Sequence, residues 1–369
     1  MNIALFTDSY LPIRDGVVSS ILAFRKGLAE KGHKMLIFAP EIIGSKKEPN
    51  VFRFASLPFP PYPDYHAAIF PHVSSSFAKK FSIDLVHCKA MTTMALSAIW
   101  FSKRARLPSL ASLETMIPEG VHYVLPKQAE KIGKAAVWAY MKFLYSNFSL
   151  VTAPSIHACK MLKEHGIDAV LLPSPIDTDF FKPGTGKQVR EELGLNGKKI
   201  VLSVGRIVKE KNYDFILEVA KLLEKEGVIF LLVGKGPYLE EFRHKVASLG
   251  LSECIRFAGF VPDERLPEFY NAADSFIFPS TFETQGLTLL EALACGKPAC
   301  VLQGTPMQEF IEEKKTGYSF SDSQDCAEKL LLCISKSEKM KHDCRSKALQ
   351  YSIPVCTQKL IKLYEQLLS

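Results

Sequence analysis

Short apolar runs alternate with longer amphipathic segments along the first 175 residues. A short continuous apolar run is typical of a buried strand, and apolar positions at helical spacing are typical of a helix that packs on a core. The pattern predicts strands at 2–6, 34–39, 51–54, 85–88, 109–113, 150–153 and 169–172. It predicts helices at 17–31, 67–80, 92–103, 128–145 and 156–165. This alternation favours parallel strands joined by crossover helices, with ligands beyond the carboxyl ends of the strands.

The same alternation resumes in the second half of the chain. It predicts strands at 200–204, 228–233, 255–258, 275–278 and 299–302, with helices at 213–225, from 238 onward, at 287–295 and after the strand 299–302. A Pro/Gly-rich segment at 173–184 separates the halves and is typical of a hinge between domains. A chain of 369 residues exceeds one typical core. We therefore predict an α/β protein with two Rossmann-like, doubly wound parallel-sheet domains, 1–178 and 179–352, that face a central cleft, followed by an amphipathic segment at 353–369.

One loop is unusually apolar. Residues 57–65 combine prolines with aromatic side chains. Two interpretations remain open: the loop packs under the next helix, or it forms a lip over a ligand site.

Composition narrows the class of protein. At 47% hydrophobic and 23% charged residues, the chain resembles an ordinary globular protein. Nine scattered cysteines without a C-x-x-C pair indicate free thiols in a reducing compartment, so we expect a cytoplasmic protein. The chain opens on a strand-like run, which predicts no signal peptide, and no apolar segment approaches the length of a membrane span.

The positive charge is confined to one half. Residues 1–185 hold 21 basic and 14 acidic residues, whereas the remainder holds 25 of each. A basic half suggests an anionic partner, such as a nucleic acid, an acidic lipid or a phosphate-bearing substrate. Alternatively, a net charge of +7 is modest and serves only to keep the protein soluble. No nucleic-acid-binding motif is present in the sequence.

The predicted helix at 128–145 mixes basic and aromatic residues. Lys127, Lys131 and Lys134 are interleaved with Trp138 and further apolar side chains. Such a helix can lie on an anionic membrane surface. Alternatively, its apolar face belongs to the core and its lysines are solvated. The sequence leaves both interpretations open.

The most informative stretch is 282–298. A loop that carries Glu283 follows the predicted strand 275–278 and leads into a helix that carries Glu291. The first turn of that helix leaves the amides of Gly286 and Leu287 without internal partners, and such amides attract an anion such as a phosphate. The two carboxylates suit sugar or ribose hydroxyls. For any single glutamate, a solvated surface position is the more common outcome.

Two further loops carry candidate chemistry. Arg206 and Lys211 follow the predicted strand 200–204, where a guanidinium and an ammonium can grip a diphosphate, although exposed loop cations are also common. Gly16 opens a helix after the first strand, and this turn either faces an anion or is only a tight connection.

Five stretches together resemble the retaining glycosyltransferases of family 4, which have the GT-B fold of two Rossmann domains. The N-terminal stretch is similar to that of family-4 enzymes that glycosylate lipids, of the diacylglycerol or phosphoinositide type. The stretches are E-x7-E at 283–291 with its flanks, G-R-x-x-x-x-K at 205–211, T-D-x-Y-x-P…G-V-x-x-S at 7–20, F-x-G-x-V-P at 257–262 and A-D-S-F-I-F-P-S at 273–280.

The resemblance implies a role for each candidate residue. Glu291 would hold the ribose hydroxyls of a nucleotide-sugar donor and Glu283 the sugar hydroxyls. Arg206, Lys211 and the amides at Gly286 and Leu287 would neutralise the leaving diphosphate, which is a large term in catalysis. The remaining implied donor contacts are Gly16, against the diphosphate, and Gly234 and Val261, which line the base pocket.

The resemblance also implies that the reaction needs few additional components. It implies no metal ion and no cofactor besides the donor, for which a UDP-sugar is expected, and the sequence has no D-x-D site. The segment 353–369 would cross back onto the first domain. Two places depart from the family pattern. Ser174 and Pro175 stand where relatives carry Asn-Gly, and Glu114 stands where relatives usually carry a histidine near the donor sugar. Glu114 either accepts a sugar hydroxyl or repels the diphosphate.

These implications give a functional hypothesis. The protein is expected to move a hexose from a UDP-sugar to a membrane glycerolipid such as diacylglycerol, as a peripheral enzyme on the cytoplasmic face of the cell membrane. Lys127, Lys131, Lys134 and Trp138 would contact the membrane or acceptor. The alternatives are transfer to a soluble sugar or polysaccharide precursor, a nucleotide-sugar epimerase, and a catalytically weak nucleotide-sugar-binding protein.

Overall fold

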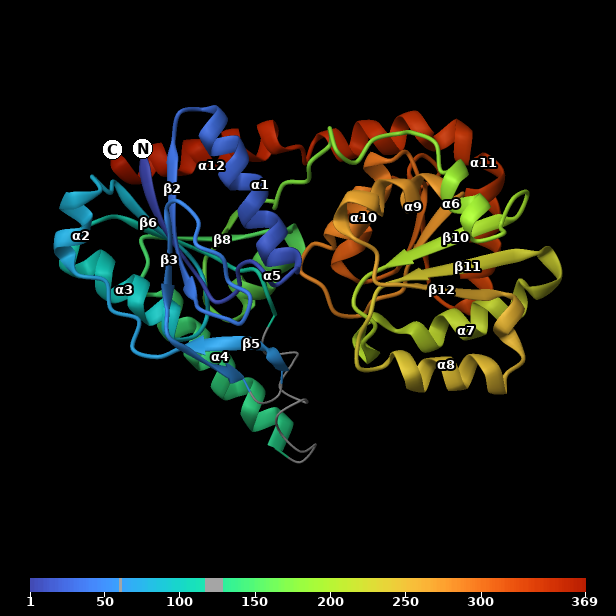
Figure 1. Cartoon of the computed structure of the whole chain (residues 1–369), viewed down its shortest axis with the longest axis horizontal. Coiled ribbons are helices and arrows are strands. Elements are labelled where there is room, and N and C mark those ends of the chain that lie inside the picture. The colour runs from blue at the N-terminus through green and yellow to red at the C-terminus, as the bar shows by residue number, and fades with distance from the viewer. Residues whose placement is uncertain (60–61, 117–128) are drawn as a thin grey trace. The chain divides into compact units, whose positions relative to one another are not determined.

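The computed structural model describes residues 1–59, 62–116 and 129–369, and the chain forms two compact units (Figure 1). The first unit comprises Met1–Pro175 together with Ile353–Ser369, and the second comprises Ile176–Ser352. The expected boundary at 178/179 thus falls inside the second unit. The reason is Arg345, which donates hydrogen bonds of 2.7 Å to the carbonyl oxygens of Thr178 and Phe181.

The first unit is built on a seven-stranded sheet in the order β3-β2-β1-β6-β7-β8-β9, and every neighbouring pair is parallel. The winding direction reverses between β1 and β6, which makes the carboxyl ends of these strands a topological switch point. The strands are β1 (Asn2–Thr7), β2 (Lys34–Pro40), β3 (Val51–Phe54), β6 (Leu85–Lys89), β7 (Ser109–Ser112), β8 (Leu150–Ala153) and β9 (Val170–Leu171).

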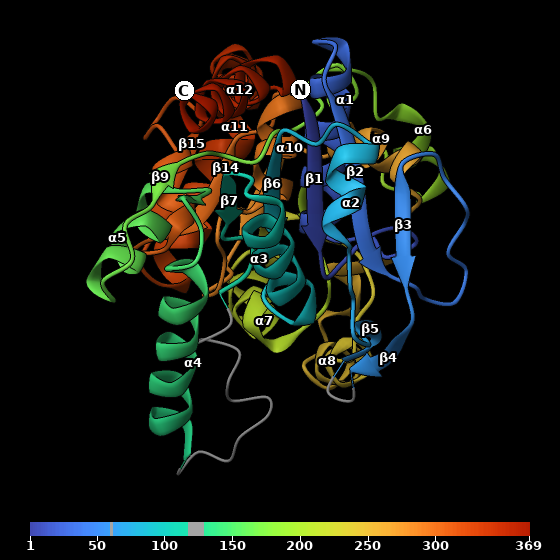
Figure 2. The same ribbon diagram turned by 90° about the vertical axis from the view of Figure 1, so that its left-hand side faces the viewer.

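Helices cover this sheet, and α3 packs against β1 and β6 (Figure 2). The last helix of the chain belongs to this unit. Gly27 packs so closely on it that a methyl group there would overlap Oγ1 of Thr357, and Oη of Tyr364 lies 2.7 Å from Nδ1 of His87. The helices are α1 (Gly16–Glu30), α2 (Ser75–Lys80), α3 (Thr93–Ala105), α4 (Glu130–Tyr145), α5 (Ile156–Glu164) and α12 (Ile353–Leu368).

The segment around residue 65 was predicted wrongly. The predicted helix at 67–80 is confined to α2, and the expected apolar loop contributes to an antiparallel hairpin of β4 (Ser56–Phe59) and β5 (Tyr62–Ala68). Phe70, with a φ of 45°, and Pro71 stop a helix from extending back, because proline disfavours helical backbone in the residue before it. In the hairpin Leu57 is 62% exposed, and Phe70, which follows the hairpin, is 92% exposed.

The second unit contains a six-stranded parallel sheet in the order β12-β11-β10-β13-β14-β15. Numbered within the unit, this order is 3-2-1-4-5-6, the Rossmann order, with its switch point between β10 and β13. All residues of β11 and β13 are buried, because helices cover both faces of the sheet, and this explains their uninterrupted apolar runs. The strands are β10 (Lys199–Val204), β11 (Val228–Val233), β12 (Ile255–Gly259), β13 (Ser275–Phe278), β14 (Ala299–Leu302) and β15 (Gly317–Phe320).

The helices of the second unit alternate with its strands in sequence, except between β14 and β15, where a 3₁₀ helix (Pro306–Phe310) takes this place. The longest, α11, follows the last strand, whereas α6 precedes the first. They are α6 (Lys187–Glu192), α7 (Tyr213–Leu222), α8 (Leu239–Ser248), α9 (Leu266–Ala272), α10 (Leu287–Ala294) and α11 (Ser323–Leu349).

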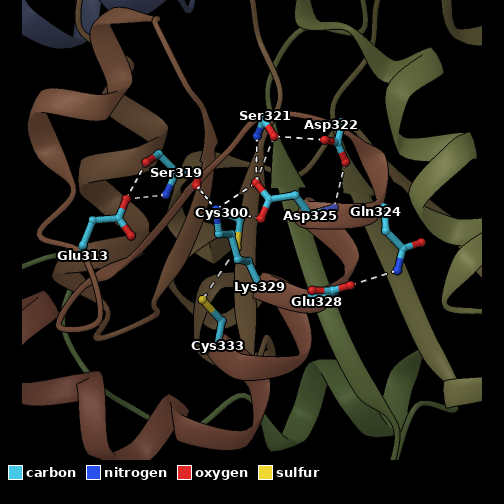
Figure 3. Close-up of polar contacts among 10 residues, drawn as sticks. All are labelled: Cys300, Glu313, Ser319, Ser321, Asp322, Gln324, Asp325, Glu328, Lys329 and Cys333. Carbon is cyan, nitrogen blue, oxygen red and sulfur yellow. Dashed lines mark hydrogen bonds and ion pairs between the residues drawn. The ribbon is translucent and has the colours of Figure 1, made fainter.

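Polar contacts fix the start of α11 (Figure 3). The Asp322 side chain accepts a 2.9 Å hydrogen bond from the amide of Asp325, as an N-cap residue does, and Lys329 bridges Asp325 and the carbonyl oxygen of Ser319. Cys300 and Cys333 lie beneath, with their sulfur atoms 3.7 Å apart, and burial raises the pKa of the Cys300 thiol well above its usual value. None of the nine cysteines, all of which lie in described segments, forms a disulfide.

Candidate functional site

In the second unit, a lysine and a glutamate meet at the carboxyl ends of β10 and β13. Lys211 ends a 3₁₀ turn (Lys209–Lys211) that follows β10, and its Nζ donates to Oε1 of Glu283 in the loop between β13 and α10. Oγ of Ser280 lies 3.2 Å from the same carboxylate oxygen, and the ring centroid of Phe278 lies 5.1 Å from the ammonium. The sequence predicted both charged residues, and the fold brings them into contact at the switch point.

The start of α10 lies next to this pair in the chain. Gly286 precedes the helix with a φ of 69°, and a methyl group there would overlap Sδ of Met307, so backbone conformation and packing both require glycine. The N-cap residue is this glycine, which has no side chain to cap the helix. The amide of Leu289 donates to the Gly286 carbonyl oxygen, whereas the amides of Leu287 and Thr288 lie too early in the helix to find an acceptor within it, and this favours an anion at that place.

Glu291 lies one turn further along α10 and is held by a buried tyrosine. Oη of Tyr270, from α9, donates a 2.7 Å hydrogen bond to Oε2 of Glu291. Burial raises the pKa of Glu291 to about 7, while the Tyr270 hydrogen bond acts in the opposite direction and Asp263 adds to the rise. A carboxylate with this pKa is ionised above neutral pH, where it can accept hydrogen bonds from hydroxyl groups.

Three other predicted donor-binding residues lie at the same edge of this sheet. Arg206 is exposed in the loop after β10. Gly234 follows β11, where a methyl group would overlap the carbonyl oxygen of Gly205, so close packing of two loops already explains this glycine. Val261 follows β12 and is buried. The three therefore differ in access to a ligand, and Arg206 is the most accessible.

A second lysine–glutamate pair lies in the first unit, and sequence reasoning found only half of it. Lys89 is the last residue of β6, and its Nζ donates to Oε1 of Glu114, which follows β7. The same ammonium donates a 2.8 Å hydrogen bond to Oγ of Ser20 and lies 4.9 Å from the ring centroid of Phe24. A lysine directly after the apolar run 85–88 was the available signal, since lysine is rarely buried without a partner.

Gly16 begins α1, as predicted, but the helix already has an acidic partner. The Asp15 carboxylate accepts a 2.8 Å hydrogen bond from the amide of Val18 and a 2.7 Å hydrogen bond from Oγ of Ser9. An anionic ligand at this turn would therefore meet a carboxylate of the protein.

Each of the two interpretations of the sequence of α4 agrees with some of its residues. Met141, Leu144 and Tyr145 are buried, as the core interpretation requires, whereas Ile132 and Phe143 are 75% and 60% exposed. The remaining predicted contacts differ in setting: Lys131 is exposed, Lys134 is half-buried, Trp138 stacks on His165 with centroids 3.6 Å apart, and Lys127 lies outside the described residues.

The described part of the chain offers neither a membrane-spanning helix nor a metal site. Within residues 1–59, 62–116 and 129–369, no helix combines the length and apolar character that crossing a bilayer requires. Within the same ranges, no cluster of three or more His, Cys, Asp or Glu side chains is arranged to hold a metal ion.

The fold is that of the GT-B glycosyltransferases. Among solved structures, a protein named HepE from Anabaena, in complex with UDP and glucose, matches with a TM-score of 0.76 at 18% identity, over 99% of both chains. The predicted fold class is thereby confirmed, and the two units correspond to two Rossmann-like domains.

Sequence comparison identifies the family of the chain. The family model described as Glycosyltransferase Family 4 matches residues 14–180, and the one described as Glycosyl transferases group 1 matches residues 187–351. An α-monoglucosyldiacylglycerol synthase of Streptococcus pneumoniae is 29% identical over 90% of this chain and 78% of its own. A protein of the same name from Acholeplasma laidlawii is 28% identical over 90% of this chain and 87% of its own. The chain belongs to the family-4 glycosyltransferases, as its motifs predicted.

Proposed function

We propose that this glycosyltransferase is a retaining, metal-independent hexosyltransferase that moves a sugar from a UDP-sugar to a membrane glycerolipid such as diacylglycerol. The observation that carries this proposal is the Lys211–Glu283 pair at the switch point of β10 and β13. It combines a cation for a diphosphate with an acceptor for sugar hydroxyls, next to a helix start whose N-cap residue is a glycine.

Each part of the UDP-sugar, namely its ribose, its sugar and its diphosphate, is proposed to bind residues of the second unit. Glu291 accepts hydrogen bonds from the ribose hydroxyls, and Glu283 accepts them from the transferred sugar. Lys211, Arg206 and the amides at Gly286 and Leu287 face the diphosphate. Positive charge that is already in place stabilises the leaving diphosphate in the transition state. In other transferases a divalent cation stabilises the leaving diphosphate. Because the protein's own positive charges take this role here, we propose that the reaction needs no metal ion.

Retention of configuration is supported by the names of the relatives. Sugar nucleotides such as UDP-glucose carry an α-linked hexose, and the Streptococcus and Acholeplasma relatives are named for an α-glucosyl product. An α-linked product from an α-linked donor means that the anomeric configuration is kept.

A lipid acceptor is supported by the same relatives and by the surface of the first unit. The diacylglycerol in their names indicates an acceptor that resides in a membrane. The basic excess of residues 1–185 and the exposed Lys131, Ile132 and Phe143 on α4 suit an anionic membrane surface. We place the enzyme peripherally on the cytoplasmic leaflet, where nucleotide-sugars are available.

The direct test is transfer from radiolabelled UDP-glucose to diacylglycerol in anionic vesicles, with excess EDTA present. The expected result is a chloroform-soluble product whose anomeric proton has the coupling of an α-glucoside. Water-soluble sugars offered in place of the lipid should remain unlabelled. Labelling of a soluble sugar alone would replace the lipid acceptor, a β-linked product would exclude retention, and full loss of activity with EDTA would exclude a metal-independent reaction.

A further inference from the structure

The Glu291 carboxylate in the second unit is bound by the protein through one of its two oxygen atoms. Oη of Tyr270 donates a 2.7 Å hydrogen bond to Oε2, and this is the only hydrogen bond that the carboxylate makes with the described residues. Glu291 is half-buried, whereas Tyr270 is fully buried. A ligand can therefore reach the carboxylate but not the tyrosine, and Oε1 is left to accept hydrogen bonds from that ligand.

The tyrosine that holds this carboxylate is itself fixed by its surroundings. Its ring packs edge-on against Phe181, with centroids 5.7 Å apart, and lies 5.9 Å from the ring of Phe276 in β13. The next residue of α9, Asn271, accepts a 2.8 Å hydrogen bond from the amide of Gly184, so the helix that carries the tyrosine is anchored as well. A hydroxyl on a fixed ring determines where the oxygen that accepts from it must lie.

We propose that Tyr270 is a positioning residue of the donor site: its hydroxyl holds Oε2 of Glu291, so that Oε1 faces the hydroxyl groups of the ribose. This inference rests on the proposed function, in which Glu291 accepts hydrogen bonds from the ribose. It makes a side chain that no ligand can reach a determinant of the preference for a ribonucleotide over a deoxyribonucleotide.

The same hydrogen bond favours the ionised form of the carboxylate. Burial raises the pKa of Glu291 to about 7 and Asp263, in the 3₁₀ turn before α9, adds to the rise, whereas the hydrogen bond from Tyr270 lowers it. Burial also raises the pKa of Tyr270 well above its usual value, so its hydroxyl keeps the proton that it donates. Cys295, one turn further along the chain, is a neutral thiol, because burial raises its pKa to about 12.

Charged groups on the elements around α10 have partners of their own. Lys297, after the helix, donates a 3.1 Å hydrogen bond to a backbone carbonyl oxygen, and Arg345 of α11 donates to three. The neighbouring strands β13 and β14, which are described in full, contribute no charged side chain. Tyr270 is therefore the group that stabilises the ionised Glu291, and removal of its hydroxyl raises the pKa of that carboxyl further.

The test is a titration of the full-length protein with UDP and with 2′,3′-dideoxy-UDP between pH 6 and pH 9, by calorimetry. The ratio of the two dissociation constants isolates the ribose hydroxyls, because the base and the diphosphate are the same in both ligands. In wild type the ratio should favour UDP above pH 7 and decline below it, by up to tenfold per pH unit. In Tyr270→Phe the midpoint of this decline should move to higher pH, and the preference at pH 9 should stay below that of wild type because the carboxylate is no longer oriented.

Two further variants separate positioning from a merely structural role. In Glu291→Gln the ratio should be small and independent of pH, and adding Tyr270→Phe to it should introduce no dependence on pH, because the tyrosine acts through the carboxylate. The matched control is Tyr238→Phe. It removes a 2.6 Å hydrogen bond from another buried tyrosine of the second unit to a carboxylate, that of Asp214, and it should leave the ratio and its midpoint at their wild-type values.

The outcomes are distinct. A midpoint in Tyr270→Phe that equals wild type overturns the inference, and so does an equal loss of affinity for both ligands, which would mark the tyrosine as merely structural. If that variant does not fold, Glu291→Asp replaces it: a carboxylate shortened by one methylene cannot hold Tyr270 and the ribose together, so an unchanged ratio overturns the inference. Wild-type protein that binds UDP and dideoxy-UDP equally also overturns it but leaves nucleotide binding in place. Wild-type protein that binds neither ligand would refute the proposed function itself.

Discussion

The two units each place a lysine–glutamate pair at the carboxyl ends of adjacent parallel strands, but they support it differently. Lys89 ends β6 and Glu114 follows β7, and Lys211 and Glu283 follow β10 and β13. Each ammonium also lies near a phenylalanine ring, at 4.9 Å from Phe24 and at 5.1 Å from Phe278. The chemistry of the two pairs is therefore the same.

The difference lies in burial and in the elements that carry the residues. Lys89 is part of a central strand and 1% exposed, whereas Lys211 ends a short 3₁₀ turn and is 24% exposed. A pair built on a sheet strand is fixed, while a pair built on loops can separate at small cost and form again around a ligand. We infer that the first pair serves to hold a carboxylate still and that the second exchanges its internal partner for the donor.

The largest expected effect concerns stability, and it separates the two pairs. Lys89→Met removes the buried cation beside the Glu114 carboxylate and should cost about 3–5 kcal/mol of unfolding free energy, whereas Lys211→Met, at a more exposed position, should cost about 1 kcal/mol. The only two tryptophans, Trp100 and Trp138, belong to the first unit, so their fluorescence during urea unfolding reports on that unit alone. Lys89→Met should shift this transition, and Lys211→Met should leave it unchanged.

The control for this comparison is the double variant Lys89→Met with Glu114→Gln. It removes both charges and should regain most of the lost stability, because no unpaired ion remains. Equal transition midpoints for wild type and Lys89→Met would show that the buried pair is not a fixed support.

The second effect concerns turnover. Lys211→Ala removes a positive charge that faces the leaving diphosphate, and kcat should fall about 10²-fold or more. The matched control is Lys209→Ala, two residues earlier, since Lys209 is 69% exposed and pairs with Glu241 at the surface. Undiminished transfer by Lys211→Ala, measured with saturating UDP-glucose, would contradict the exchange of partners inferred for this pair.

A third effect tests whether the units also differ in their partners. Each exposed lysine near an anionic membrane contributes on the order of 1 kcal/mol, so Lys131→Glu with Lys134→Glu should release the protein from anionic vesicles. Lys221→Glu with Lys225→Glu makes the same charge change on the second unit and should leave binding unchanged. Co-sedimentation at low and high salt measures both. Wild-type protein that stays in the supernatant at low salt would refute the membrane interpretation.

The smallest effect is a dependence of nucleotide binding on pH. Glu291 accepts ribose hydroxyls when ionised, so the affinity for UDP should fall as the pH drops below about 7, by up to tenfold per pH unit.

The stability of the unliganded protein should depend on pH in the opposite direction, so that it is higher at low pH. Because folding raises the pKa of Glu291 from its usual 4.5, the stabilisation is present below that value and is lost as the pH rises through about 7. In Glu291→Gln both dependences should be absent, and their persistence would implicate another group.

The features that could be predicted from the sequence are those that depend on residues close together in the chain. The strands 228–233 and 299–302 were predicted to the residue, because each is an apolar run between turn residues. Glu283, Glu291 and Lys211 were found because they belong to contiguous motifs. Lys89 was missed because its role arises from contacts with Glu114 and Ser20, far apart in sequence. The hairpin of β4 and β5 was missed because the pairing of two strands, rather than composition, creates it.

The assignment of α12 to the first unit has a consequence for how the protein is made. The second unit is one uninterrupted segment, 176–352, inserted between two pieces of the first. On the ribosome it can therefore reach its native state while the first unit still lacks its final helix, since chains fold domain by domain as they emerge. Only after α12 has emerged can Tyr364 reach His87 and Thr357 pack on Gly27. A prematurely terminated chain would thus carry a defect in the domain that was synthesised first.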